Sequence, residues 1–297
     1  MLYIGGLGRS GSTILDMLLG DVSGVANVGE VRHLWERGLR QNALCSCRAT
    51  FAECEFWSAV GEHAYGGWGS VDAAAMVACA RAVDRHRQLP ALLARPAGLR
   101  VELGRYSEVL AQLFAAIHAV SGAELVVDSS KDPPHGFVLR QVPGLDLRAV
   151  HLVRDSRGVA YSWTKVVARP DATGGDRMMT RMSPARTALM WLDANALLEV
   201  LGRSVRSVRV RYEDMVDDPD LWVARVLDGT GIDAAARSGS AVHHAVGGNP
   251  VRFRPDRGPL RIDREWRQKL SPRARRTVTS LTAPMLWRYG YSLDGAV

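Results

Sequence analysis

The first twenty residues, Met1–Gly20, read MLYIGGLGRSGSTILDMLLG and decide the expected fold. Leu2, Tyr3 and Ile4 form a short apolar run that is typical of a buried strand, and four glycines follow within the next seven residues. From Ser12 the apolar residues recur at helical spacing, which predicts an N-capped helix with one apolar face. A strand, a glycine-rich turn and a helix start predict a phosphate-binding loop, because backbone N–H groups and the helix dipole converge there on an anion.

This loop is close to the Walker A pattern of nucleotide-binding proteins without satisfying it. Gly6 and Gly11 have the required separation, and Thr13 holds the final hydroxyl position. Ser12, however, stands where the pattern requires lysine. The nearest cation is Arg9, whose planar guanidinium is suited to clamping an anionic group. The alternative is a glycine-rich turn beside a solvated arginine, which leaves the conformational cost of so much glycine unexplained.

The composition predicts a folded protein with a basic surface. A chain of 297 residues with 47% hydrophobic content can build one large domain or two small ones. Lys+Arg exceed Asp+Glu by 38 to 31, and most of the cations are arginines, which suit phosphate-type anions. Because these cations are dispersed along the chain, a nucleic-acid-binding module is disfavoured. Glycines and an arginine interrupt the apolar start, so we expect no signal peptide or membrane span and a cytoplasmic protein.

Four cysteines occur, and three of them are close together. Cys45, Cys47 and Cys54 follow the pattern C-x-C-x6-C, and Cys79 stands apart. Three residues are one short of the four ligands of a structural zinc site. A packing role with reduced thiols is therefore favoured over a metal site, although free, disulfide-bonded and metal-bound states all stay open.

Polar residues follow the ends of two further predicted strands. Residues 124–128 (ELVVD) predict a buried strand, and Lys131 stands just beyond it. Residues 147–153 (LRAVHLV) predict another, followed at once by Arg154, with Ser162 eight positions later in a predicted helix. The carboxyl ends of strands in an open α/β sheet line the ligand crevice, so these cations are expected to face the phosphate-binding loop. Two separated cationic positions indicate a ligand with two anionic groups.

The rest of the chain predicts a single α/β domain over residues 1–297, with a central parallel sheet of about five strands flanked by helices. Alanine-rich helical patterns mark residues 60–120 as a helical insertion. Residues 165–182 and 245–262 are rich in glycine and arginine and are predicted to be mobile loops that contact substrate or cofactor. The second loop carries three candidate anion ligands, Asn249, Arg252 and Arg254.

These motifs resemble the sulfotransferases that use 3'-phosphoadenosine-5'-phosphosulfate (PAPS). GRSGST at residues 8–13 is similar to their RSG[ST]T loop, in which arginine replaces the lysine of the cytosolic members that sulfate steroids and phenols. LVRDSRGVAYSW at residues 152–163 is similar to the family's 3'-phosphate motif, which gives that role to Arg154 and Ser162. The likeness rests on these motifs and the GNP-containing tail, while residues 40–120 add little. It implies that PAPS, or its product adenosine 3',5'-bisphosphate, binds Gly8, Arg9, Ser10, Gly11, Ser12, Thr13, Arg154, Ser162, Asn249, Arg252 and Arg254.

The candidate catalytic residues are similar to those of the tyrosylprotein sulfotransferases. In that group a glycine–glutamate pair lies 21 residues past the loop arginine, as Glu30 lies past Arg9, and a Lys-Asp-Pro ends a strand, as at Lys131. The resemblance implies that Glu30 is the general base and that Arg9 and Lys131 stabilise the transferring group. Two such cations can neutralise the developing charge without a metal, so none is predicted. The fallback bases are His33, His135 and His151, the last being more typical of a core histidine.

The expected acceptor is a hydroxyl of a small phenolic, glycosidic or lipid-like molecule, because no secretory signal points to a protein tyrosine or a polysaccharide. Its candidate contacts are Glu30, Arg32 and Trp35. No nucleic acid or membrane partner is predicted, and a homodimer stays open.

Two other functions compete with sulfuryl transfer. A P-loop kinase or nucleotide hydrolase is disfavoured by Ser12 and by the lack of a clear Walker B carboxylate. A catalytically inactive nucleotide-binding scaffold would need Arg154 and Ser162, but would need neither Glu30 nor Lys131.

Overall fold

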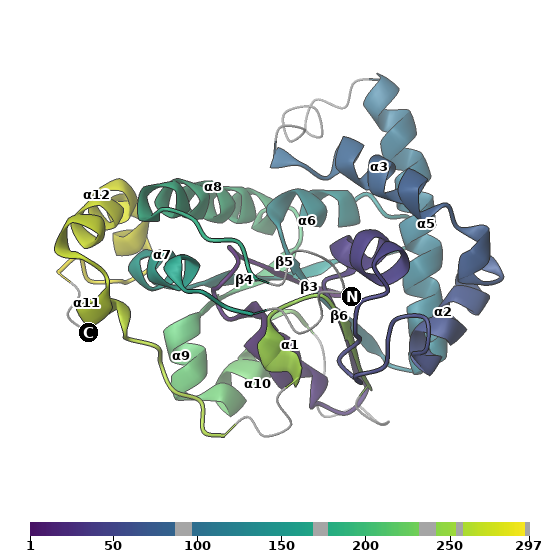
Figure 1. Ribbon diagram of the computed structural model, residues 1–297, viewed down its shortest axis with the longest axis horizontal. Coiled ribbons are helices and arrows are strands. Elements are labelled where there is room, and N and C mark those ends of the chain that lie inside the picture. Colours follow the sequence, from purple (N-terminus) through teal and green to yellow (C-terminus); the bar gives the residue numbers. More distant parts are fainter. Residues whose placement is uncertain (87–96, 169–177, 232–241, 254–257, 295–297) are drawn as a thin grey trace.

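A six-stranded parallel sheet forms the centre of the protein (Figure 1). The computed structural model describes residues 1–86, 97–168, 178–231, 242–253 and 258–294. The strand order is β5-β4-β1-β3-β2-β6, and the strands are β1 (Leu2–Gly5), β2 (Val25–Gly29), β3 (Leu125–Lys131), β4 (Arg148–Val153), β5 (Arg206–Arg211) and β6 (Val242–Val246). The predicted α/β class with a parallel sheet is confirmed. Strand β6 was not predicted, because two histidines interrupt the apolar pattern of its sequence VHHAV.

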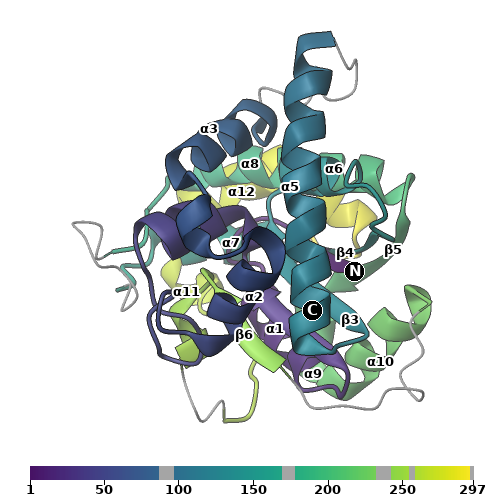
Figure 2. The ribbon, with the colours of Figure 1, turned by 90° about the vertical axis from the view of Figure 1, so that its right-hand side faces the viewer.

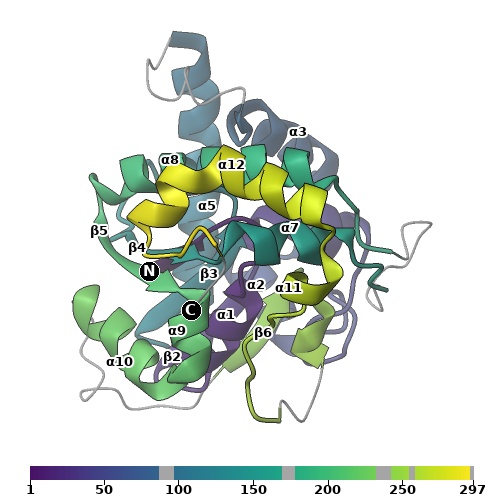
Figure 3. The same ribbon diagram turned by 90° about the vertical axis from the view of Figure 1, so that its left-hand side faces the viewer.

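Helices cover both faces of the sheet (Figures 1 and 3). On one face lie α1 (Ser12–Gly20), α9 (Tyr212–Asp217) and α10 (Pro219–Gly229). On the other lie α6 (Pro133–Leu139) and α8 (Pro184–Gly202), with α7 (Ser156–Thr164) and α12 (Pro272–Arg288) packed beside α8. The shorter elements are the 3-10 helices η1 (Val31–His33), η3 (Trp68–Ser70) and η5 (Pro250–Phe253), the π-helix η2 (Leu34–Arg40) and α11 (Trp266–Lys269).

The side chains of β1 show how the two faces are buried. Leu2 and Ile4 belong to one hydrophobic cluster with Leu15 of α1. Tyr3, on the opposite side of the strand, belongs to a second cluster with Leu198 of α8. Because strands buried on both faces are apolar along their length, the run LYI is sufficient to place β1 in the middle of the sheet.

The turn between β1 and α1 is the predicted glycine-rich loop. Helix α1 begins at Ser12, as expected, but its N-cap is Gly11, and no side chain caps the helix. Gly11 has a φ of 95°, and a Cβ atom there would lie 2.5 Å from the Tyr212 ring, so only glycine fits. The predicted side-chain cap is therefore wrong, and the start of α1 faces the cleft described below without one.

The predicted helical insertion corresponds to α2 (Glu55–Tyr65), α3 (Ala73–Val83) and α5 (Ala97–Ser121), which stand together at one end of the sheet (Figure 2). Side chains of α2 and α5 share a hydrophobic cluster with Tyr3 and Val126 of the sheet. This shared core supports one domain with a helical insertion, which stays a prediction. None of the described helices is long and apolar enough to cross a membrane.

The structure describes both predicted loops, residues 165–182 and 245–262, only in part. Residues 169–177 of the first loop and residues 254–257 of the second, including Arg254, lie outside the described residues. The parts that are described flank the cleft at the carboxyl ends of the strands.

Candidate active site

A cleft of about 630 Å³ opens at the carboxyl ends of the strands. The strand order reverses at β1, whose neighbours are β3 and β4, and ligands of open α/β sheets bind at such a reversal. Ten of the residues predicted from the sequence line this cleft: Gly8, Arg9, Gly11, Ser12, Thr13, Glu30, Lys131, Arg154, Ser162 and Asn249.

Arg9 lies in the middle of the loop, and two nitrogens of its guanidinium group make no hydrogen bond to the described residues. Its φ is 77°, a left-handed conformation that is uncommon outside glycine. The guanidinium lies over the Trp163 ring, 5.4 Å from the centroid, and Trp163 Nε1 donates to Gly8 O at 2.9 Å. Arg9 Nε and Nη2 are buried with no hydrogen-bond partner among the described residues, and burial lowers the pKa of Arg9. Such unmatched cationic donors fit an anionic ligand.

Glu30 and Lys131 form an ion pair across the floor of the cleft. Glu30 follows β2, and its backbone N–H donates to Val246 O at 2.7 Å. Lys131 Nζ contacts Glu30 Oε1, and Lys131 ends β3 with a φ of 59°. Burial would raise the pKa of Glu30, but the charges of Lys131, then of His33 and Arg37, outweigh it and lower this pKa to about 2. Glu30 is therefore an ionised carboxylate at neutral pH, although only 4% of the residue is exposed.

His33 lies beside this pair. Its Nε2 is 3.5 Å from Glu30 Oε2, and Arg37 Nη1 is 3.9 Å from the same oxygen. Burial and the charge of Arg37 lower the pKa of His33, so its imidazole is neutral at neutral pH. Of the three fallback bases, His33 is the one that lines the cleft.

The end of β4 supplies a second cationic position in the cleft. Arg154 follows β4 and stacks on the Tyr212 ring, 4.4 Å from its centroid. Its Nη1 donates to Arg9 O at 3.0 Å, and its Nη2 lies 3.1 Å from Asp263 Oδ2. Lys165 Nζ lies 3.2 Å from the same carboxylate oxygen. Ser162 lines the same cleft from α7, so both members of the predicted arginine–serine pair line it.

The tail segment closes one side of the loop. Asn249 donates its backbone N–H to Thr13 Oγ1 at 3.2 Å. Arg252 donates to Gly248 O at 3.0 Å and to Leu44 O at 3.3 Å, and it does not line the cleft. These two bonds hold Arg252 against the backbone of neighbouring segments, and its predicted contact with the cofactor stays a prediction. Ser10, 1% exposed, is likewise outside the lining.

Two of the predicted acceptor contacts, Trp35 and Arg32, do not line the cleft. Trp35 is 1% exposed, and its Nε1 donates to Tyr106 Oη at 3.0 Å, so this ring belongs to the core and not to an acceptor site. Arg32 pairs with Asp84 at 2.7 Å and with Asp132 at 2.8 Å. These pairs hold Arg32 at the wall of a neighbouring pocket.

That neighbouring pocket has a volume of about 450 Å³. It shares Gly8, His33, Lys131 and Trp163 with the cleft, so the two spaces meet at the lysine. The rest of its lining is a mixture of charged and apolar side chains, including Leu7, Arg32, His86, Asp132, Arg186, Met190 and Asp193. A molecule in this pocket can therefore reach Lys131 from outside the cleft.

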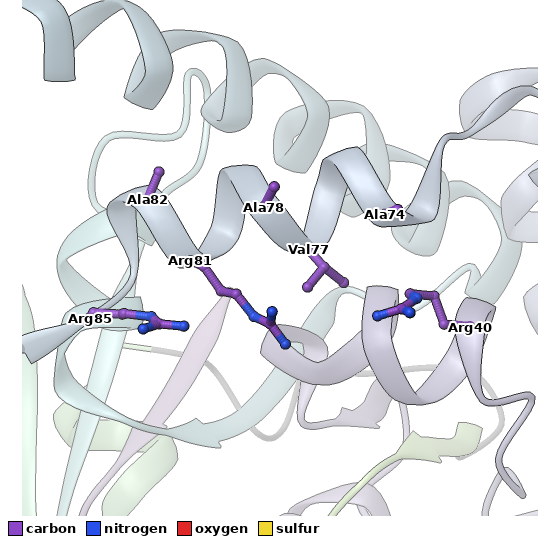
Figure 4. A pocket seen from close by; sticks show the side chains of 7 residues that line it. All are labelled: Arg40, Ala74, Val77, Ala78, Arg81, Ala82 and Arg85. Carbon is purple, nitrogen blue, oxygen red and sulfur yellow. The ribbon is translucent and has the colours of Figure 1, made fainter.

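A separate groove of about 550 Å³ lies between α3 and η2. Figure 4 shows the guanidinium groups of Arg40 and Arg81 extending toward the same space, with Arg85 beyond the end of α3. Glu36 Oε2 pairs with Arg40 at 2.9 Å and with Arg81 at 3.8 Å. The described residues that line this groove include no carboxylate and no histidine, so the groove offers positive charge but no proton acceptor.

His135, predicted as a fallback base, is instead a buried structural ion. Its Nδ1 lies 3.2 Å from Asp84 Oδ2 and its Nε2 lies 3.1 Å from Asp128 Oδ2. Burial opposes the charged form, but these two carboxylates raise the pKa of His135 to about 9. His151 is the opposite case, because burial lowers its pKa to about 4, and it is the core histidine that the sequence predicted.

The buried His135 predicts a loss of stability at alkaline pH. Its folded pKa of about 9 lies above its unfolded value of 6.5, so its stabilising contribution is complete below pH 6.5 and disappears as pH rises through 9. We expect the free energy of unfolding, measured with urea, to fall by roughly 3 kcal/mol across this range. His135→Gln should flatten that slope, whereas His151→Gln should change only the acid side. An unchanged alkaline slope in His135→Gln would contradict the assignment.

Sequence reasoning did not identify several residues that line the cleft. Tyr212 directly follows β5, so the strand-end rule that selected Lys131 and Arg154 would also have selected it. Arg37, Lys165 and Asp263 follow no strand and belong to no motif. Only the fold brings these three to the cleft.

Comparisons with known proteins identify relatives of this fold. A family model described as "Sulfotransferase family" matches residues 2–236. The sulfotransferase domain of the Synechococcus PCC 7002 olefin synthase superposes with a TM-score of 0.53 at 19% identity, over 96% of this chain and 94% of that one. A sulfotransferase domain from the curacin biosynthetic pathway gives a TM-score of 0.52 at 15% identity, over 98% of both chains. No curated protein sequence gave a significant match.

Proposed function

The chain belongs to the sulfotransferase family, and on that premise we propose that it transfers a sulfuryl group from PAPS to a hydroxyl of a small molecule. The observation that carries the choice of donor is the pair of cationic positions in one cleft. Arg9 lines this cleft from the loop and Lys131 from the end of β3, while Arg154 lines it from the end of β4. PAPS carries a phosphosulfate at one end of its adenosine and a 3'-phosphate at the other, so its two anionic groups match this arrangement.

The residues present fit this donor. The buried Arg9 nitrogens without partners supply donors for the phosphosulfate, and the uncapped start of α1 adds backbone N–H groups. Arg154 and Ser162 are positioned to hold the 3'-phosphate, and Tyr212 keeps the Arg154 guanidinium in place by stacking. When bound, PAPS supplies an activated sulfuryl group whose transfer leaves adenosine 3',5'-bisphosphate.

The chain's own residues then divide the chemistry. Glu30 is ionised and accepts the proton of the acceptor hydroxyl. Lys131 and Arg9 place positive charge where negative charge develops on the transferred group and the leaving oxygen. Lys131 lies at the junction of the cleft and the neighbouring pocket, so it touches both the donor side and the acceptor side. Holding the reactants in line between these residues lowers the entropic part of the barrier.

The neighbouring pocket of about 450 Å³ is the proposed acceptor site. Its volume suits a small molecule, and its mixture of Met190, Trp163 and charged side chains suits a phenolic or glycosidic alcohol. The arginine groove between α3 and η2 keeps an anionic polymer as a second candidate acceptor. Because Glu36 pairs with two of its arginines and offsets part of their charge, we favour the small molecule.

Isothermal titration calorimetry tests the donor assignment. We expect adenosine 3',5'-bisphosphate to bind tightly without metal, and ATP with magnesium to bind weakly. Preference for ATP with magnesium would overturn the proposal and favour a P-loop kinase. Screening small-molecule alcohols with PAPS then identifies the acceptor.

The same measurement tests the 3'-phosphate position. Arg154→Ala should weaken bisphosphate binding by about 1.5–3 kcal/mol, or roughly 10- to 150-fold, because it removes a charge-assisted hydrogen bond. Asp263→Asn should act in the opposite direction, since the carboxylate on Arg154 Nη2 repels an incoming phosphate. AMP, which lacks the 3'-phosphate, is the control ligand and should bind both variants as it binds the wild type. Equal losses for AMP and the bisphosphate would place the 3'-phosphate elsewhere.

A further inference from the structure

Four side chains outside the active site converge on one point. The sulfurs of Cys45, Cys47 and Cys54 and a ring nitrogen of His244 all lie within 4.8 Å of one another. None of the three cysteines is in a disulfide. Cys45 and Cys54 are buried, whereas Cys47 is exposed. The proposed sulfuryl transfer uses none of these groups.

The distances within this cluster are close to those of a tetrahedral metal site. In a tetrahedron with Zn–S bonds of about 2.3 Å and a Zn–N bond of about 2.0–2.1 Å, the ligand atoms are about 3.5–3.8 Å apart. The distance of 3.6 Å between Cys47 Sγ and Cys54 Sγ and that of 3.7 Å between His244 Nδ1 and Cys45 Sγ fall in this range. His244 Nδ1 is closer to Cys54 Sγ, at 3.2 Å, and all four atoms lie within 4.8 Å of one another, so small shifts bring all four to one ion.

The backbone around the cluster orients these ligands. Ser46 N donates to Ala245 O at 3.1 Å, and Ala245 N donates to Ser46 Oγ at 2.8 Å, so Ser46 bonds the cysteine loop to β6 through its backbone and its side chain. Trp57 Nε1 donates to His244 O at 2.9 Å. Cys54 is the N-cap of α2, where the helix dipole favours a thiolate. His244 Nδ1 faces the sulfurs, so a metal-bound ring carries its proton on Nε2.

We propose that Cys45, Cys47, Cys54 and His244 bind one structural zinc ion. Three thiolates and one imidazole form a Cys3His set, which is a known ligand combination of structural zinc sites, and its soft sulfur donors disfavour magnesium or calcium. All four positions are protein ligands, so the site is closed and takes no part in the chemistry. The sequence pattern identified only three of the four ligands, because His244 follows Cys54 by 190 positions and lies in a strand that was not predicted.

The ion would fix one wall of the active site. Cysteine ligands lie between η2 and α2, and His244 lies in β6 two residues before its end. Val246 O at that end accepts the Glu30 N–H at 2.7 Å, and a Cβ atom on Gly247 would lie 3.2 Å from Glu30 Cβ. Zinc therefore ties the cysteine loop to the strand that supports the general base. This inference does not depend on the identity of the donor or the acceptor.

Metal analysis of the protein purified without chelators and with a phosphine reductant tests the proposal. We expect about one zinc per chain, released by a mercurial thiol reagent and detected with a zinc-binding dye. Cys47→Ser should lose the zinc, and it is the best variant because Cys47 is the exposed ligand. Cys79→Ser, outside the cluster, is the matched control and should retain the zinc.

Two further measurements keep the test decisive if Cys47→Ser fails to fold. Cobalt(II) exchanged into the wild type should give the visible bands of a tetrahedral thiolate site. Thiol titration of the metal-free, denatured protein under the same conditions should give four free thiols. Wild-type protein that lacks zinc after growth and refolding with added zinc, or a count of two thiols that indicates a disulfide, would overturn the proposal.

Discussion

Replacing Glu30 with glutamine is expected to reduce turnover by roughly 10²- to 10⁴-fold, which is the usual contribution of a general base. Glutamine keeps the shape of the side chain but cannot accept the hydroxyl proton. The affinity for adenosine 3',5'-bisphosphate should not fall, because Arg154 and the loop carry the proposed donor contacts. This affinity should even rise in Glu30→Gln, because Lys131 is then released from its carboxylate partner and can contact the ligand. Steady-state kinetics and calorimetry on the same preparation separate the two effects.

Glu36→Gln is the matched control for this variant. Glu36 is also a glutamate close to the cleft, but it pairs with Arg40 and does not line the site. Its turnover should match that of the wild type. Undiminished turnover in Glu30→Gln would remove Glu30 as the base and leave the neutral His33, 3.5 Å from Glu30 Oε2, as the next residue to replace.

The pH profile adds a second readout. The pKa of Glu30 is lowered to about 2, so this carboxylate stays ionised across the range in which the protein can be assayed. We therefore expect the wild-type kcat/KM to show no acid limb from Glu30 between pH 5 and 8. The cations around Glu30 are the reason that this limb is absent, because burial alone would raise the pKa of Glu30.

The sequence predicted the residues that a strand end positions, and for a physical reason. A parallel strand delivers the residues just after it to the same edge of the sheet, so Lys131 and Arg154 needed only the recognition of two apolar runs. Glu30 was not selected by this rule, because its candidacy came from the resemblance, through its spacing of 21 residues from Arg9. Tyr212 obeys the rule as well, and only the absence of a motif kept it from the list of candidates.

The sequence failed where a side chain's direction decides its role. Trp35 lies close to Glu30 in the chain, yet the π-helix η2 turns its ring into the core. Arg252 stands in an arginine-rich tail, but its Nη1 and Nη2 donate to backbone carbonyls. The approach of His244 to the cysteines required a strand whose own pattern is weak. Contacts between distant segments are invisible to local pattern, and these residues depend on them.

The replacement of Lys131 should lower turnover by roughly 10²- to 10³-fold, the range found when one preorganised donor to a developing anion is removed. In Lys131→Ala the pKa of Glu30 should rise, because burial would no longer be opposed by the ammonium group. The residual activity of Lys131→Ala should then fall as pH decreases, so its pH profile should show an acid limb that the wild-type profile lacks. Arg85→Ala, which also removes a basic side chain but from outside the cleft, is the control and should change neither rate nor profile.

The backbone of Lys131 makes stability and activity separable. Its φ of 59° is a left-handed conformation that costs an L-residue about 1–2 kcal/mol and costs glycine almost nothing. Lys131→Gly and Lys131→Ala lose the same ammonium group, so both should lose the same activity. Lys131→Gly should nevertheless have the larger free energy of unfolding in urea, by up to about 1 kcal/mol. The difference is smaller than the cost of the left-handed conformation, because glycine also has the larger entropy in the unfolded chain. Equal stability of Lys131→Ala and Lys131→Gly would contradict this account. It would mean that the left-handed backbone at Lys131 carries no energetic cost, and that the protein gives up no stability to place this lysine at the junction of its two pockets.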